Sequence, residues 1–162
     1  MSYAIPYFVA LDDCSSLTLG EFSELILRAP KKRVGAITLE ELCSVSEYPH
    51  GLYLIFDGNN SPCYVGKATS RSFIERIPSH FDPREIAWFN TIPKRVMKFS
   101  EGVVYQDALK QGLSLNILLI GINDTRATGK LERVLRSYMR PRFNSRKFEF
   151  SANDSLAELV SS

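Results

Sequence analysis

Five side chains between residues 53 and 80 are of the types that can cleave a phosphodiester bond. An arginine can donate two hydrogen bonds to a phosphate, and a histidine can accept the proton of an attacking water. A tyrosine has an ordinary pKa of about 10, so it acts as a base only where neighbouring cations favour the phenolate. Taken singly, each has a plainer interpretation as a strand aromatic, a surface cation or a packing histidine. The five are Tyr53, Tyr64, Lys67, Arg76 and His80.

A β-hairpin is the element that must position the two tyrosines. Two apolar runs flank the turn-forming residues 57–62, a pattern typical of a hairpin with a longer loop. A symmetric loop pairs Ile55 with Tyr64 and Tyr53 with Gly66. Because side chains alternate along a strand, both tyrosines then lie on one face as diagonal neighbours, about 7–8 Å apart at Cα.

Helix signals flank this hairpin on both sides. Capping boxes that begin at Thr18 and Thr38 predict two short helices, which we interpret as a cap on the sheet, with a DNA-contacting arm as the alternative. After the hairpin, Thr69 or Ser70 can cap a helix that runs through Arg76. Pro78 disfavours helical geometry before it, so a common direction for Arg76 and His80 is an assumption.

The second half of the chain predicts a helical stretch, a buried strand and a long helix. Residues 82–112 are expected to be helical, and the apolar run 113–122 is the strongest candidate for a buried strand. The next helix is expected to begin at Thr125 or Thr128 and to end near Met139. A short amphipathic helix is expected near the end of the chain.

Together these elements predict an α+β fold, a small mixed three-stranded β-sheet flanked by helices. A chain of 162 residues is expected to form a single domain, 1–162. Within it we distinguish an N-terminal extension, 1–48, and a core, 49–146, with a helical insert at 82–112. Residues 147–162 form a C-terminal tail.

Charge is concentrated near the C-terminal end of the core. The segment from residue 126 to residue 147 holds eight cationic side chains and one acid, Glu132. A solvated helix face is the plainer interpretation, but a lone carboxylate among cations suits a nucleic-acid surface that contains a metal ligand. The candidate DNA-binding residues are Arg126, Lys130, Arg133, Arg136, Arg140, Arg142, Arg146 and Lys147.

The composition argues against two classes of protein. No run of 18 apolar residues occurs and the N-terminus lacks a secretory pattern, so no membrane partner is expected. Cys14, Cys43 and Cys63 are odd in number and lack paired metal spacing, which predicts a cytoplasmic location.

The motifs resemble those of the GIY-YIG nuclease superfamily. Gly51-Leu52-Tyr53 and Tyr64-Val65-Gly66 are similar to the two tripeptides that name it, and Glu132, Pro141 and Asn144 follow in the family's order. The local pattern is closest to the N-terminal nuclease domain of the bacterial excision-repair incision subunit. The match covers roughly residues 51–144.

The resemblance implies a role for each candidate residue. Tyr53 would be the general base or its relay, with Tyr64 as its partner, and Lys67 and His80 would tune or deprotonate the base or the water. Arg76 would bind the scissile phosphate, and Glu132 would be the ligand of Mg²⁺ or another divalent cation such as Mn²⁺. Asn144 would brace the site.

The expected function is therefore that of a metal-dependent DNA endonuclease acting on double-stranded DNA, of restriction, repair or mobile-element type. The alternatives are a DNA-binding module of the same fold that no longer cuts, and an RNA-cleaving relative. The intact set of candidate residues argues against the inactive alternative. The oligomeric state stays open, and a dimer is compatible with the sequence.

Overall fold

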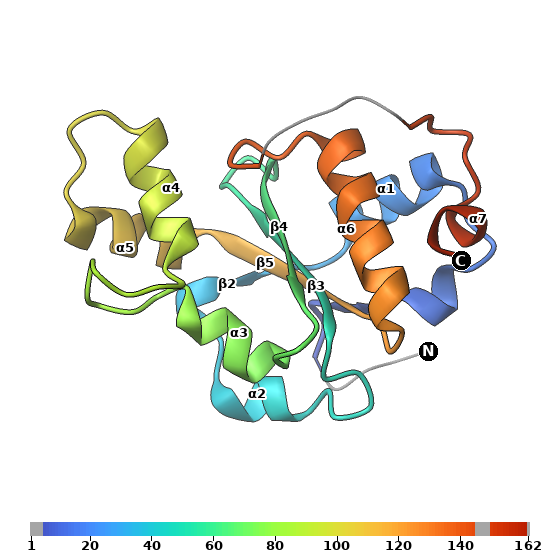
Figure 1. Cartoon of the computed structure of the whole chain (residues 1–162), viewed down its shortest axis with the longest axis horizontal. Coiled ribbons are helices and arrows are strands. Elements are labelled where there is room, and N and C mark those ends of the chain that lie inside the picture. The colour runs from blue at the N-terminus through green and yellow to red at the C-terminus, as the bar shows by residue number, and fades with distance from the viewer. Residues whose placement is uncertain (1–4, 145–149, 162) are drawn as a thin grey trace.

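The computed structural model describes residues 5–144 and 150–161, which form a mixed five-stranded sheet with helices on both faces (Figure 1). The strand order is β1-β5-β3-β4, and β2 also pairs with β5. The α+β class is therefore confirmed. The strands are β1 (Phe8–Ala10), β2 (Lys32–Arg33), β3 (Gly51–Phe56), β4 (Pro62–Ala68) and β5 (Asn116–Gly121).

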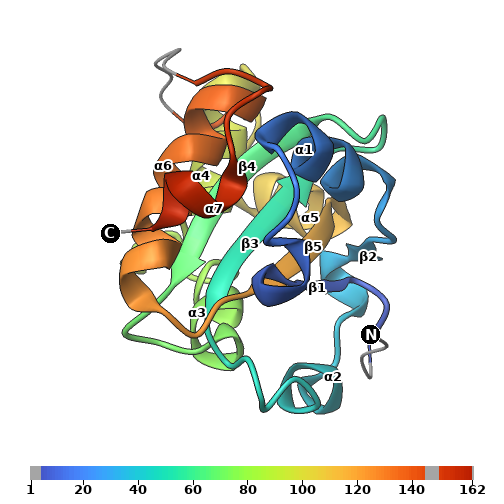
Figure 2. The ribbon, with the colours of Figure 1, turned by 90° about the vertical axis from the view of Figure 1, so that its right-hand side faces the viewer.

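Two helical layers cover the sheet. Figure 1 shows α2 to α5 on one side, and Figure 2 shows α1, α6 and α7 over the other. None of the described helices is long and apolar enough to cross a membrane. The helices are α1 (Leu19–Arg28), α2 (Leu39–Cys43), α3 (Phe73–Ser79), α4 (Thr91–Phe99), α5 (Tyr105–Ser114), α6 (Thr125–Met139) and α7 (Leu156–Val160), with 3-10 turns at Leu11–Cys14 and Val34–Ala36.

The hairpin has the predicted register. Antiparallel β3 and β4 pair Ile55 with Tyr64 and Tyr53 with Gly66, and β5 pairs with the other edge of β3. The carboxylate of Asp57 accepts hydrogen bonds from two backbone N–H groups of the turn, which closes the loop locally. The strand predicted at 113–122 is confirmed as β5, although α5 occupies its first two positions.

The prediction of three strands is wrong, because the N-terminal 48 residues contribute two more. β1 runs parallel to β5, with Phe8 opposite Leu119, and β2 pairs antiparallel with the start of β5, with Lys32 opposite Ile117. An apolar strand such as β5 leaves unpaired backbone groups at a sheet edge unless another segment covers it. Residues 1–48 therefore complete the sheet. Both predicted capping boxes are present, at the starts of α1 and α2.

Residues 82–90 form an irregular loop, which corrects the prediction of a helix beginning at Asp82. The Asp82 carboxylate accepts hydrogen bonds from the backbone N–H and the guanidinium of Arg84. Such a local side-chain bond offers the backbone an alternative to the helix. Helical structure begins only at Thr91, and Pro93 is tolerated because it lies in the first turn of α4.

Two helix starts also differ from the predicted ones. Ser72, rather than Thr69 or Ser70, forms the capping box of α3. The Asp124 carboxylate caps α6 by accepting hydrogen bonds from the N–H groups of residues 126 and 127. Both are good N-cap residue types, so sequence alone did not distinguish them from their neighbours.

Candidate active site

The two motif glycines allow close approaches that a side chain would block. Gly51 has a φ of 147°, and a Cβ there would overlap the backbone of β5. Gly66 lies opposite Tyr53, and a Cβ at Gly66 would overlap the tyrosine ring. The cross-strand pairing therefore gives the Tyr53 side chain its path over the backbone of β4.

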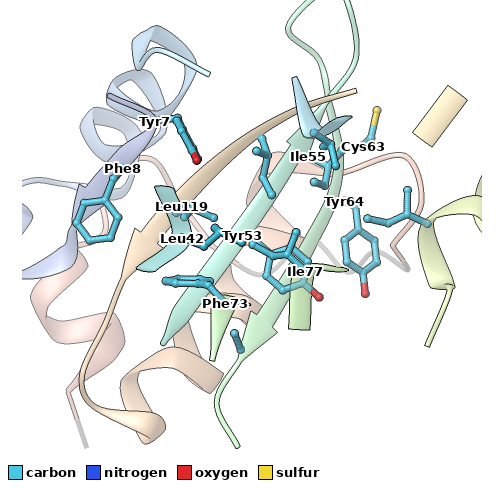
Figure 3. Close-up of a cluster of buried hydrophobic side chains, with 14 of the residues drawn as sticks. Tyr7, Phe8, Leu42, Tyr53, Ile55, Cys63, Tyr64, Phe73, Ile77 and Leu119 are labelled. Atoms are coloured by element: carbon cyan, nitrogen blue, oxygen red, sulfur yellow. The ribbon is translucent and has the colours of Figure 1, made fainter. Parts of the chain in front are cut away.

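Tyr53, Tyr64 and His80 form a cluster of three rings. The Tyr53 hydroxyl lies 2.6 Å from His80 Nε2, and the ring centroids of the two residues are 5.4 Å apart. Tyr64 completes the cluster, with its ring 6.2 Å from Tyr53 and 5.7 Å from His80. In Figure 3 the two tyrosines lie beside each other with their hydroxyl ends pointing the same way. All three residues are buried.

Pro78 does not disrupt the helix that supplies His80. It lies inside α3, which ends one residue later, and His80 follows as the C-cap residue with its N–H donating to the carbonyl of Ile77. Arg76, one turn earlier, lies close enough for its charge to lower the pKa of His80. The structure thus places Arg76 and His80 at the same site.

Burial dominates the protonation of the three rings. It raises the pKa of both Tyr53 and Tyr64, and the nearby Arg76 offsets this only in part. It lowers the pKa of His80 to about 3, with the Arg76 charge as the smaller cause. In the free protein both phenols are protonated and the imidazole is neutral, because the nearby cations do not offset the effect of burial.

Because His80 is buried, we expect the protein to lose stability at acid pH. Because the pKa of His80 falls from 6.5 to about 3 on folding, only the unfolded chain gains this proton between those pH values. The free energy of unfolding should decrease by up to about 1.4 kcal/mol per pH unit as pH falls below 6.5. Urea unfolding from pH 7.5 to pH 4 measures this.

His80→Gln is the matched control, since its amide can still bond to the Tyr53 hydroxyl but cannot take up a proton. The carboxylates that titrate in the same range are common to both proteins, so the difference between the two pH profiles isolates His80. Parallel profiles for the parent and the variant would show that His80 is accessible to protons in the folded state.

A polar pocket of about 610 Å³ is lined by residues of β4, of α3, of α6 and of the loops before α3 and α4. Four cationic side chains and one carboxylate line it, and Tyr64 is the ring of the cluster that reaches it. Such an excess of positive charge favours a phosphate ligand. The pocket is lined by Tyr64, Lys67, Thr69, Ser70, Arg71, Arg76, Phe89, Glu132 and Arg136.

Glu132 is the carboxylate of this pocket. It projects from α6 with a side chain 13% exposed, and its oxygens lie 3.9 Å from Lys67 Nζ and 3.4 Å from an Arg136 guanidinium nitrogen. Among the described residues, no group of three or more acidic, histidine or cysteine side chains is arranged so that it could hold a metal ion. Mg²⁺ often binds one or two carboxylates and completes its shell with waters and substrate phosphates, so a single Glu in a pocket lined by phosphate-binding cations fits it.

Asn144 braces the edge strand beside the pocket. Its side-chain oxygen accepts a hydrogen bond from the Val65 N–H at 2.8 Å, and its amide nitrogen donates to the Val65 carbonyl at 3.3 Å. The N–H of Phe143 donates to the carbonyl of Cys63. These hydrogen bonds pair backbone groups in the first half of the β4 edge. The second half of that edge faces the pocket.

The basic segment does not form a single surface in the described residues. Lys130 Nζ donates to the carbonyl of Ser161, and the Arg133 guanidinium lies over Phe150, so both face the C-terminal segment. Arg142 packs against Phe99. Arg136 lines the pocket, Arg126 and Arg140 lie at the two ends of α6, and Arg146 and Lys147 fall outside the described residues.

Four pocket residues were absent from the sequence-based candidate site residues, namely Thr69, Ser70, Arg71 and Phe89. Arg71 and Phe89 line the pocket, and the Arg71 guanidinium lies 4.6 Å from the centre of the Phe89 ring. An arginine just before the cap of α3 was a usable signal for the first of them. Nothing in the sequence marked Phe89, which reaches the pocket from the loop before α4.

Comparisons of the chain with protein-family models, with curated proteins and with solved structures found no match.

Proposed function

We propose that this protein is a metal-dependent DNA endonuclease of the GIY-YIG type. The observation that carries the proposal is the convergence of Tyr64 from β4, Arg76 from α3 and Glu132 from α6 on one pocket. A phenol, a bidentate cation and a metal-binding carboxylate are together the groups that phosphodiester hydrolysis needs. The resemblance to the GIY-YIG motifs involves the same three residues.

The cationic side chains bind and polarise the phosphate. Arg76 presents a planar guanidinium that matches two phosphate oxygens, and Arg71 adds a second one at the same wall of the pocket. Lys67 and Arg136 supply charge from the opposite side, where they also hold Glu132. Charge that develops on the phosphate is therefore met by groups already in place.

The phenolate form of Tyr64, whose fraction grows with pH, accepts the proton of the attacking water. Tyr64 is the phenol that the water can reach, because it lines the pocket while Tyr53 lies behind it. The contact between the Tyr53 hydroxyl and His80 Nε2 holds the Tyr53 ring against Tyr64. A divalent cation bound at Glu132 would supply charge stabilisation for the leaving oxygen.

The alternative is a binding module that does not cut. A carboxylate among four cations weakens phosphate binding, because it cancels part of the attraction. For a module that only binds DNA, the negative charge of Glu132 opposes the phosphate, although the same carboxylate contacts Lys67 and Arg136. This favours the enzyme over the binding module.

Incubation with supercoiled plasmid tests the proposal. The expected result is nicking or linearisation with Mg²⁺ or Mn²⁺ and none with a chelator, and sequencing of the ends then maps the cut. A protein that binds the plasmid but leaves it intact with either metal would be the binding module. A parallel incubation with RNA tests the RNA-cleaving alternative.

The cleavage rate is expected to rise with pH. The pKa of Tyr64 is raised, so its phenolate fraction grows up to about tenfold per pH unit between pH 6 and pH 9. His80, whose pKa is lowered to about 3, would as a direct base give a flat profile over this range. Single-turnover cleavage across the range measures the slope, and Tyr64→Phe should remove it. A flat parental profile would exclude Tyr64 as the base.

A further inference from the structure

The loop before α4 exposes large apolar side chains beside the pocket. Ile86 is 89% exposed and Trp88 is 90% exposed, whereas Phe89 is 41% exposed and turns toward the pocket. Large apolar side chains gathered in one exposed segment commonly mark a binding surface. They lie in the irregular segment 82–90, so the geometry of a helix does not account for their exposure.

Hydrogen bonds from its own Asn90 and from side chains of α4 and α5 hold this loop in place. Asn90 donates hydrogen bonds from its amide to the carbonyls of Arg84 and Glu85, and Lys94 Nζ donates to the carbonyl of Ala87 at 3.0 Å. The buried Tyr105 hydroxyl bonds to the same Asn90 amide and to the loop carbonyl of residue 82. The loop therefore presents Trp88 from a backbone that is already ordered, which lowers the entropic cost of binding.

Phe89 connects the exposed loop to the phosphate pocket. The guanidinium groups of Arg71 and Arg76 lie 4.6 Å and 5.3 Å from the centre of its ring. The Trp88 ring is centred 6.5 Å from that of Phe89. Trp88 is thus the next aromatic side chain beyond the pocket-lining Phe89. An exposed aromatic surface therefore adjoins the pocket in which a phosphate would bind.

We infer that Trp88 stacks on an unstacked nucleobase of the DNA strand whose phosphate occupies the pocket. The inference rests on the proposed function. Positive charge beside exposed aromatic rings is the combination that binds single-stranded nucleic acid, since the cations track the backbone and the rings stack on bases. Bases inside an intact duplex are covered by their neighbours, so the ring needs an unpaired base or must insert between base pairs.

This assigns a substrate class to the site, namely DNA with an unpaired base close to the cleaved phosphate. Ile86, on the same loop, supplies a second apolar contact. The protein should bind and cut such DNA more readily than the fully paired duplex of the same sequence.

Trp88 is the only tryptophan of the chain, so intrinsic fluorescence reports on it directly. The protein is titrated, with Ca²⁺ in place of Mg²⁺ to prevent cutting, with three oligonucleotides. One is a continuous duplex, one carries a two-nucleotide bulge, and one carries the same bulge without its bases. We expect strong quenching by the bulged duplex, and weak quenching by the continuous and the abasic ones.

A variant and a matched control complete the test. Trp88→Ala should bind the bulged duplex about 5- to 100-fold more weakly in an anisotropy assay, and should lose the preference for it over the continuous duplex. Leu39→Ala removes another exposed apolar side chain, on α2 and outside the pocket lining, and should bind as the parent does.

The other outcomes separate this inference from the proposed function. If the parent cuts DNA while Trp88 fluorescence and the Trp88→Ala variant show no effect, the stacking inference is wrong and the nuclease stands. If the parent neither binds nor cuts any of the three oligonucleotides, both are wrong. If Trp88→Ala instead shifts the sedimentation of the protein without altering DNA binding, the loop is a contact between copies of the chain, which also overturns the inference.

Discussion

Glu132→Gln is expected to lower the cleavage rate by about 10³-fold while DNA binding stays equal or becomes tighter. The loss follows from the metal, because a neutral amide is a poor ligand for Mg²⁺ and charge stabilisation of the leaving oxygen is worth several kcal/mol. The gain in binding follows from the pocket, where Glu132 is the carboxylate among four cations. The measurements are single-turnover cleavage in Mg²⁺ and DNA affinity in the presence of a chelator.

A lower cleavage rate together with an equal or higher DNA affinity would not be expected if Glu132 had only a structural role. A structural defect would lower both, and a screening effect on phosphates would change affinity alone. Glu24→Gln removes one negative charge from the exposed surface of α1 and should change neither. A Glu132→Gln protein that cuts at the parental rate would rule out Glu132 as the metal ligand.

Tyr64→Phe is expected to reduce cleavage by about 10²- to 10⁴-fold, the range typical of a lost general base. Tyr53→Phe should reduce it less, because the Tyr53 hydroxyl acts through the ring cluster and does not line the pocket. The double variant should then be no slower than Tyr64→Phe alone, since residues that act as a unit are not additive. Single-turnover rates of the three proteins on one substrate measure this.

For the free energy of unfolding we expect the opposite order, with a larger loss in Tyr53→Phe than in Tyr64→Phe. Tyr53→Phe leaves His80 Nε2 buried without a partner, which costs about 1–3 kcal/mol of unfolding free energy. Tyr64→Phe removes a hydroxyl at the pocket wall and should cost less. Tyr48→Phe is the control, because the Tyr48 hydroxyl donates a hydrogen bond to Asp12 at the surface, outside the ring cluster. If Tyr53→Phe proves the slower of the two enzymes, Tyr53 is the base and Tyr64 its partner.

Features that depend on neighbouring residues were predictable from the sequence. The turn residues and the alternation of apolar side chains determined the register of β3 and β4, including the opposition of Tyr53 and Gly66. The capping boxes at Thr18 and Thr38 located α1 and α2, because their hydrogen bonds span only three residues. The apolar run of β5 and the stripe of α6 likewise carry their own signals.

Features that depend on distant partners were decided by the tertiary structure. β1 and β2 are only three and two residues long, too short for any periodicity, and exist because the edge of β5 needs partners. The loop 82–90 replaced the predicted helix because Asp82 and Asn90 bond to its backbone. Helix packing also turned Lys130 and Arg133 toward the C-terminal segment, away from the pocket.

The protonation of the site was decided in the same way. The sequence identifies Tyr53, Tyr64 and His80 as titratable groups, and it leaves open whether neighbouring cations favour a phenolate. The fold buries all three rings between the sheet and α3, and desolvation then outweighs the cations. Residue types and spacing therefore determined which groups meet at this site. Their charge states depend on how completely the surrounding elements exclude water, which no local pattern encodes.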